Sequence, residues 1–97
     1  MTDTGEAGAA ARRKRLKFRA WHRGFKEADL IFGHFADSRL ESLDEAGLAA
    51  FERLLEAPDQ DAYDWIVGRS EPPPEQDTEV LAMLREFNYF AGTLWTR

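Results

Sequence analysis

The chain has 97 residues, of which 43% are hydrophobic and 32% are charged, and it contains no cysteine. That length fits one domain with one modest core, and the lack of thiols excludes disulfides, cysteine-ligated metal sites and thiol nucleophiles. Two histidines, His22 and His34, are too few for a histidine-based metal site, and no apolar run approaches the roughly 20 residues of a membrane span. These features predict a small, soluble, intracellular domain that works by binding.

The charge is unevenly distributed along the chain. Residues 1–26 hold eight basic and two acidic side chains and carry +6, whereas residues 27–97 hold five arginines and 16 acidic side chains and carry −11. This pattern has two interpretations. Either the fold neutralises the basic segment internally, or the basic segment meets an acidic or phosphate-bearing partner.

Helix-forming composition and hydrophobic periodicity predict an all-α, single-domain bundle of five helices, at about residues 9–21, 26–37, 43–56, 59–67 and 74–87. No alternating β-branched run predicts a strand. Residues 1–8 are expected to be a disordered N-terminus, residues 9–90 the bundle and residues 91–97 a flexible tail. Three aromatic side chains are assigned to the core: Phe51, Tyr63 and Trp65.

Turn and capping residues mark the predicted helix ends. Ser42 to Glu45 reads as a capping box, Asp59 as an N-cap and Gly68 as a helix stop. Pro74 suits the first position of the last helix. Gly33 lies inside a predicted helix, which costs about 1 kcal/mol relative to alanine unless close packing requires the missing side chain.

Catalysis and metal binding are poorly supported by the sequence. The serines are accounted for by turns and caps, and a bundle of this size has little room for the enclosed pocket that acid–base chemistry needs. DNA binding through the basic segment is an alternative, but the later helices, which would supply a recognition helix, are acidic.

The most informative segment is Trp21-His22-Arg23-Gly24-Phe25-Lys26-Glu27-Ala28-Asp29, where charges of both signs surround a glycine between two helices. Arg23 and Glu27 are four residues apart, so an ordinary ion pair is one interpretation. The other is that Arg23 presents its five-donor fork to a partner or phosphate-bearing cofactor while Glu27 orients it. In the first interpretation Gly24 provides a positive φ or allows close approach of another backbone, and in the second it leaves room for the partner.

The segment Arg23-Gly24-Phe25-Lys26-Glu27 resembles the Arg-Gly-x-x-Glu signature of the SdhE-like succinate dehydrogenase assembly factors, also called flavinators. Asp29 follows at the family's position. The runs Phe51-Glu52-Arg53-Leu54-Leu55-Glu56 and Asp59-Gln60-Asp61-Ala62-Tyr63-Asp64-Trp65-Ile66 resemble the family's later core. The resemblance covers roughly residues 12–90.

This resemblance implies a non-enzymatic helper that promotes covalent attachment of FAD to the flavoprotein subunit of succinate dehydrogenase, and also of the related fumarate reductase. The helper would bind the immature subunit and orient its histidine and flavin, so that FAD is carried by the partner and not bound stably here. The motif residues Arg23, Gly24 and Glu27 map to partner binding, with Asp29, His22 and Trp21 as neighbours. Trp95, in the tail, is a further candidate interface aromatic.

The resemblance also implies a free monomer without nucleic acid or membrane insertion. It would be cytoplasmic in a bacterium and in the mitochondrial matrix of a eukaryote. Two alternatives remain open from the sequence: an antitoxin-type regulatory module that binds a protein, and a nucleic-acid-binding helical protein.

Overall fold

The computed structural model describes residues 4–91, and within that range it is helical without any strand. The five α-helices and the two short 3₁₀ turns are α1 (Thr4–Trp21), α2 (Lys26–Arg39), η1 (Leu40–Ser42), α3 (Glu45–Glu56), α4 (Asp59–Val67), η2 (Pro74–Gln76) and α5 (Glu79–Ala91). The predicted all-α bundle of five helices is therefore confirmed.

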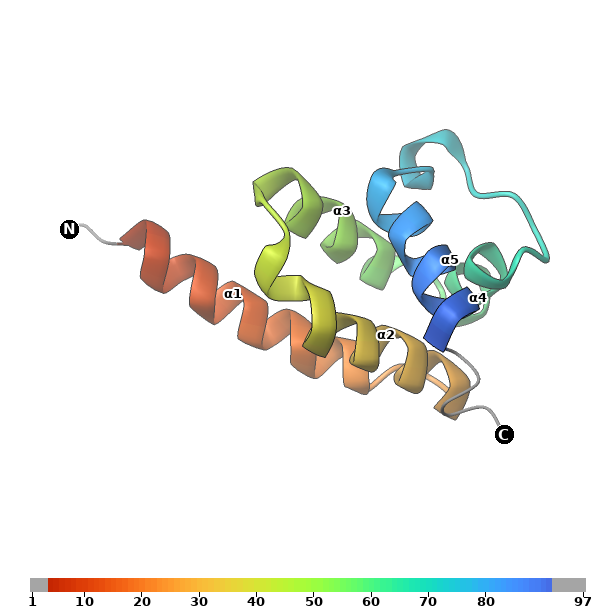
Figure 1. The fold of residues 1–97 in the computed structure, drawn as a ribbon, viewed down its shortest axis with the longest axis horizontal. Helices are drawn as coiled ribbons and strands as arrows, with labels where there is room; N and C mark the ends of the chain where they lie inside the picture. The colour runs from red at the N-terminus through yellow and green to blue at the C-terminus, as the bar shows by residue number, and fades with distance from the viewer. Residues whose placement is uncertain (1–3, 92–97) are drawn as a thin grey trace.

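The helices form two groups that meet along α2 (Figure 1). The α1 and α2 helices run side by side in opposite directions and form a hairpin, while α3, α4 and α5 lie together across α2. The N-terminal turns of α1 project past the rest of the bundle. The turn between α1 and α2, which carries the Arg-Gly-x-x-Glu motif, therefore lies at the opposite end of the hairpin from the N-terminus.

The first helix begins earlier and the last helix ends later than the sequence predicts. The α1 helix begins at Thr4 rather than at residue 9, and residues 1–3 lie outside the described part. The α5 helix continues to Ala91, so the tail expected from residue 91 starts no earlier than residue 92. The rest of that tail, Trp95 included, lies outside the described residues.

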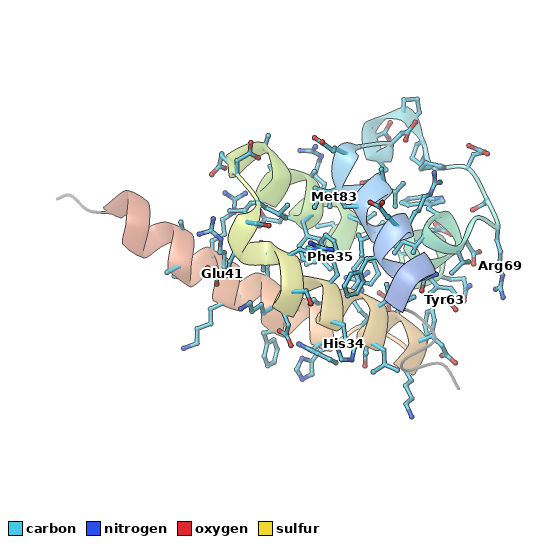
Figure 2. All side chains as sticks on the ribbon, viewed as in Figure 1. His34, Phe35, Glu41, Tyr63, Arg69 and Met83 are labelled. Carbon is cyan, nitrogen blue, oxygen red and sulfur yellow. The ribbon has the colours of Figure 1, made fainter. Side chains whose placement is uncertain are left out.

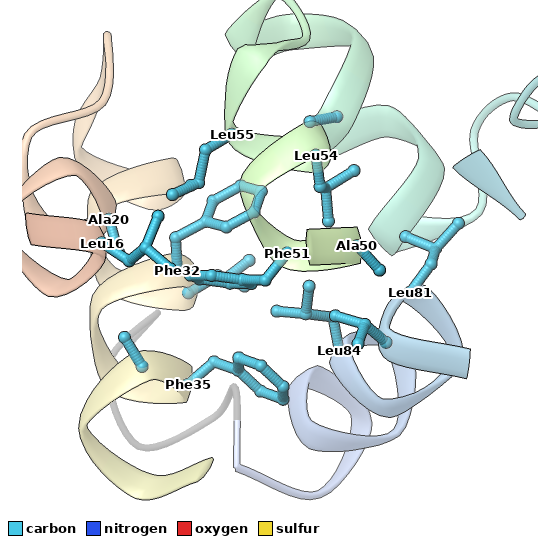
Figure 3. Close-up of a cluster of buried hydrophobic side chains, with 14 of the residues drawn as sticks. Leu16, Ala20, Phe32, Phe35, Ala50, Phe51, Leu54, Leu55, Leu81 and Leu84 are labelled. Carbon is cyan, nitrogen blue, oxygen red and sulfur yellow. The ribbon is translucent and has the colours of Figure 1, made fainter. Parts of the chain in front are cut away.

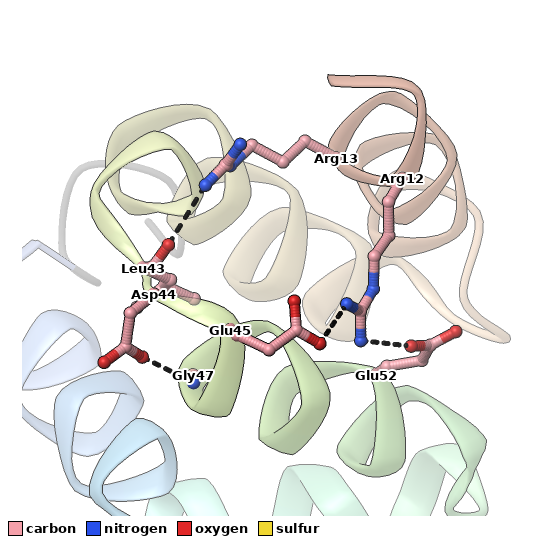
Figure 4. Close-up of polar contacts among 7 residues, drawn as sticks. All are labelled: Arg12, Arg13, Leu43, Asp44, Glu45, Gly47 and Glu52. Carbon is pink, nitrogen blue, oxygen red and sulfur yellow. Dashed lines mark hydrogen bonds and ion pairs between the residues drawn. The ribbon is translucent and has the colours of Figure 1, made fainter. Parts of the chain in front are cut away.

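Two arginines tie α1 to the middle of the chain (Figure 4). Arg12 bridges α1 to α3 through Glu45 at 2.6 Å and Glu52 at 3.0 Å, and these hydrogen bonds raise the pKa of the Arg12 guanidinium above its usual value. Arg13 donates to the backbone carbonyls of Leu40 and Leu43, each at 3.1 Å. Part of the +6 segment is thus neutralised or bonded within the fold, as the first of the two charge interpretations expects.

The start of α3 differs from the predicted capping box. Asp44, not Ser42, is the N-cap, and its side chain accepts from the Gly47 N–H at 2.9 Å. Ser42 instead belongs to η1 and its hydroxyl donates to the Arg39 carbonyl at 2.8 Å. The extra turn of η1 after α2 moves the N-cap by two residues, from Ser42 to Asp44, whose side chain supplies the acceptor that a helix N-terminus needs.

Two other helix starts also differ, and one predicted end is confirmed. Pro58 is the N-cap of α4, so Asp59 is its first helical residue rather than its cap. Pro74 opens only the turn η2, and α5 begins at Glu79 with the Thr78 hydroxyl accepting from the Leu81 N–H at 3.3 Å. Gly68 ends α4 in the left-handed conformation, with φ of 86°, as predicted.

All five α-helices contribute to the core, and Figure 3 shows the part of it that lies among α1, α2, α3 and α5. The ring of Phe51 on α3 is fully buried between the rings of Phe32 and Phe35 on α2. Its centroid lies 6.3 Å from that of Phe32 and 5.6 Å from that of Phe35. Leu81 and Leu84 close this cluster from α5. The predicted core aromatics Phe51 and Trp65 are buried, and Tyr63 is half-buried against the core.

Candidate functional site

The motif begins in a short turn that a carboxylate organises locally. Asp29, in the first turn of α2, accepts a hydrogen bond from the backbone N–H of Arg23 at 2.5 Å. The Asp29 N–H in turn donates to the Phe25 carbonyl at 3.0 Å. Asp29 therefore acts across the turn and fixes the path of the chain from α1 into α2.

The Arg23 side chain points into the protein. Only 6% of it is exposed, and its guanidinium donates to the carbonyls of Leu55 at 2.5 Å and Ala57 at 3.1 Å, at the end of α3. The same group forms an ion pair with Asp59 on α4, at 2.6 Å. The expectation of a fork held out toward a partner is wrong, because the donors are used within the chain to join the α1–α2 turn to α3 and α4.

Burial removes the charged Arg23 guanidinium from water, which is unfavourable unless other groups compensate for it. The guanidinium lies 5.0 Å from the centre of the Phe32 ring, and the buried Nε has no hydrogen-bond partner among the described residues. Desolvation lowers the pKa of Arg23 from its usual value, while the Asp59 carboxylate opposes that shift. Asp59 is thus the counter-ion that makes a buried arginine tolerable here.

Gly24 leaves room for this counter-ion. A Cβ added at Gly24 would overlap the Asp59 carboxylate oxygen Oδ2 and would stand 3.2 Å from its Cγ. Gly24 does not have a positive φ, so conformational freedom does not explain it, and the group that approaches is a side chain rather than a backbone. Arg23, Gly24 and Asp59 form one unit, which we call the Arg23–Asp59 clamp.

Glu27 is exposed at the start of α2, as is its neighbour Lys26. The ion pair of Arg23 is made with Asp59, so the predicted Arg23–Glu27 pair, and with it the role of Glu27 in orienting Arg23, is wrong. The spacing of four residues suits a pair only on a continuous helix, and the turn at residues 22–25 interrupts it. Glu27 is left facing solvent at the motif.

Trp21 packs across the glycine inside α2. A Cβ added at Gly33 would fall within the indole ring of Trp21, which explains why a glycine occupies this helical position. The indole also meets the His34 ring edge-on at 5.0 Å and donates from Nε1 to Asp37 at 3.4 Å. Trp21 is therefore half-buried in the α1–α2 contact, where it lies against His34 of α2.

Replacing Gly33 by alanine is expected to lower the free energy of unfolding by about 1–2 kcal/mol, because overpacking against the rigid indole outweighs the roughly 1 kcal/mol gain in helix propensity. Urea unfolding of the two proteins measures the difference. Gly8→Ala is the matched control, since nothing lies within 4 Å of the added Cβ there. Equal stabilisation by both substitutions would show that Trp21 does not occupy this space.

An exposed aromatic pair completes the outer side of this end of α1. Phe18 is 66% exposed and stacks on the His22 ring, with centroids 4.1 Å apart and planes inclined by 21°. The His22 Nδ1 also lies 2.6 Å from the Phe18 carbonyl. Sequence analysis missed Phe18, although a signal was present: Leu16 and Ala20 mark the buried face of α1, and Phe18 falls midway between them on the other face.

The predicted site residues thus separate into two sets. Trp21, His22 and Glu27 are exposed or half-exposed. Phe18 lies beside His22, and His34 lies beside Trp21. We call these five residues the outer motif face. Figure 2 shows His34 on the outer side of α2, away from Phe35 and the core. Arg23 and Asp29 lie behind this face and make internal contacts, whereas Gly24 is exposed in the turn beside them.

The described residues contain no group of three or more potential metal ligands. No helix among residues 4–91 is both long enough and apolar enough to cross a membrane. The chemistry that the motif region offers is a shaped surface with aromatic, imidazole and carboxylate groups, held from behind by the clamp.

Comparison with known proteins connects this geometry to a family. Residues 14–88 match the family described as flavinator of succinate dehydrogenase, a span that contains the whole motif, the clamp and the core aromatics. The chain is 41% identical over 81 residues to the FAD assembly factor SdhE of Acetobacter pasteurianus, covering 84% of this chain and 74% of that protein.

Eukaryotic relatives extend the match. The mitochondrial succinate dehydrogenase assembly factor 2 of Dictyostelium discoideum is 38% identical over 73 residues, covering 75% of this chain and 52% of the relative. The protein of the same name from Meyerozyma guilliermondii is 34% identical over 87 residues, covering 86% of this chain and 64% of the relative. None of these names supports the antitoxin or nucleic-acid alternatives. The chain belongs to the flavinator of succinate dehydrogenase family.

Proposed function

We propose that this protein promotes covalent attachment of FAD to the flavoprotein subunit of succinate dehydrogenase. The observation that carries this proposal is the family match over residues 14–88, which includes an intact Arg23-Gly24-x-x-Glu27 motif. Related proteins bear the names FAD assembly factor and succinate dehydrogenase assembly factor. The related fumarate reductase flavoprotein is a second candidate partner.

In this proposal the protein supplies orientation rather than a reacting group. It binds the immature subunit, whose own histidine and FAD then spend more time in a reactive arrangement. FAD stays with the partner, and this chain acts as a monomeric non-enzymatic helper. Its compartment would be the cytoplasm in a bacterium and the mitochondrial matrix in a eukaryote.

The outer motif face is the surface that we assign to the partner. Trp21, His22 and the exposed Phe18 offer aromatic area of the kind that concentrates binding energy in interfaces, and Glu27 adds a carboxylate. Arg23 and Asp29 support this surface from behind, with the exposed Gly24 in the turn beside them. Motif residues would then serve partner binding in two ways, by contact and by positioning.

Co-expression with the flavoprotein subunit tests the assignment, with covalent flavin read by fluorescence of the denatured subunit in a gel. Phe18→Ala and Glu27→Gln are each expected to reduce covalent flavin at least about fivefold, the effect of losing an interface contact worth 1 kcal/mol or more. Both side chains are exposed, so the variants should melt like the wild type.

Glu86→Gln is the matched control, since Glu86 is exposed on α5 and is not part of the outer motif face. Wild-type flavin attachment with both motif-face variants would contradict the surface assignment. Flavin attachment that is the same with and without the wild-type chain would contradict the proposed function itself.

A further inference from the structure

One residue of α4, Asp59, contacts both central residues of the motif. Its carboxylate pairs with the Arg23 guanidinium at 2.6 Å and occupies the space that a side chain at Gly24 would need. Asp59 is 33% exposed, while its partner is 6% exposed, so the carboxylate reaches inward from the surface. Within residues 23–27, Arg23 is the only motif residue that forms an ion pair with α4.

A second residue of α4 supports the same turn. The Phe25 ring, which follows Gly24, meets the Tyr63 ring edge-on at 5.3 Å. Asp59 and Tyr63 are four residues apart on α4 and therefore lie one turn above the other on one face. The α4 helix thus holds the turn at residues 22–25 at two points, through a charge at Arg23 and through a ring at Phe25.

The turn itself has few other anchors toward the rest of the bundle. Within the hairpin, Asp29 fixes the Arg23 N–H, which sets the local path of the chain but not the angle of the turn against α3 and α4. That angle depends on the guanidinium bonds to Leu55, Ala57 and Asp59. Of these three acceptors only Asp59 is a side chain, so it is the only one that a substitution can remove.

We propose that Asp59 is a positioning residue of the motif: by holding Arg23 and fitting against Gly24, it fixes the orientation in which the α1–α2 turn presents Glu27 and His22. The proposal rests on the proposed function for its partner, the flavoprotein subunit. It assigns a role in partner binding to a residue that does not contact the partner.

The test compares Asp59→Ala, the conservative Asp59→Asn and the control Asp61→Ala. Asp61 shares the first turn of α4 and is exposed, so its loss removes the same helix-end charge without touching the clamp. In Asp59→Ala, hydrogen exchange at the amides of residues 23–29 should be at least about tenfold faster and affinity for the flavoprotein subunit about tenfold lower. Asp59→Asn, which still accepts a hydrogen bond, should recover part of both losses.

Exchange in the core of α5 reports whether a variant has simply lost stability throughout. Faster exchange confined to the turn supports the proposal, whereas wild-type exchange and wild-type affinity in Asp59→Ala would overturn it. An effect of Asp61→Ala as large as that of Asp59→Ala would also overturn it. If the wild-type chain does not bind the flavoprotein subunit, the proposed function fails, and the exchange comparison alone decides the assignment of Asp59.

A second-site experiment uses the contact at Gly24. Gly24→Ala should weaken binding of the flavoprotein subunit in the wild-type background, because the added Cβ displaces the Asp59 carboxylate. In the Asp59→Ala background the same substitution has free space and should weaken binding less than about twofold further. Equal losses in both backgrounds would show that Gly24 and Asp59 act independently, and would overturn the clamp as the cause.

Discussion

Replacement of Arg23 by alanine is expected to lower the free energy of unfolding by about 3 kcal/mol, the lower end of the cost of breaking a buried ion pair. The lower end applies because the remaining partner, Asp59, is 33% exposed and can be hydrated once the guanidinium is gone. The carbonyls of Leu55 and Ala57 lose their donors in the same step. Each kcal/mol should lower the Tm by about 4–8 °C in a domain of this size, which calorimetry measures directly.

The same substitution should also abolish most flavin attachment in co-expression with the flavoprotein subunit. Arg15→Ala is the control, since Arg15 is an exposed cation on α1 outside the clamp. Arg23→Lys keeps the charge but not the planar fork, so it should restore little of the lost stability. A melting temperature of Arg23→Ala equal to that of the wild type would contradict the internal role of this side chain.

Phe51→Ala should have the other large effect, a loss of about 3–5 kcal/mol in the free energy of unfolding. The Phe51 ring is fully buried between Phe32 and Phe35, so its removal leaves a cavity at the junction of α2 and α3. Since small domains are stable by roughly 5–15 kcal/mol, this variant should be close to unfolding at 37 °C. Urea unfolding followed by circular dichroism measures the change.

Phe18→Ala provides the matched control, because it removes the same ring from a site that is 66% exposed. Its unfolding free energy should stay within about 0.5 kcal/mol of the wild type. The two phenylalanine variants thus separate stability from partner binding: one should unfold without being an interface residue, and the other should fold normally and bind poorly. Similar stabilities for both variants would contradict the packing described for Phe51.

The fold was largely predictable because its determinants are local. Periodic apolar residues such as Leu48, Phe51 and Leu55 define a helix face, and Gly68 ends α4 through its own backbone conformation. The errors occurred where a neighbouring segment changed a helix start. Ser42 is a residue type that favours the N-cap position, but it belongs to the 3₁₀ turn that follows α2, so Asp44 is the N-cap instead.

The site was predictable in position but not in the direction of its side chains. Sequence spacing placed Arg23 next to Glu27, yet the guanidinium turns toward Leu55, Ala57 and Asp59, which are distant in the sequence. Local spacing carries no information on such long-range partners. The motif resemblance located the turn correctly, while the separation of the outer motif face from the clamp required the three-dimensional arrangement.

The long sequence separation within the clamp has a consequence for the newly made chain. Arg23 and the Ala57 carbonyl that it binds are 34 residues apart, which at about 5–20 residues per second corresponds to a delay of roughly 2–7 s during translation. Until α4 has left the ribosome, the Arg-Gly-x-x-Glu sequence exists without its final geometry. Nascent chains released before Asp59 would carry the complete signature and still lack the side-chain arrangement that we propose for partner binding.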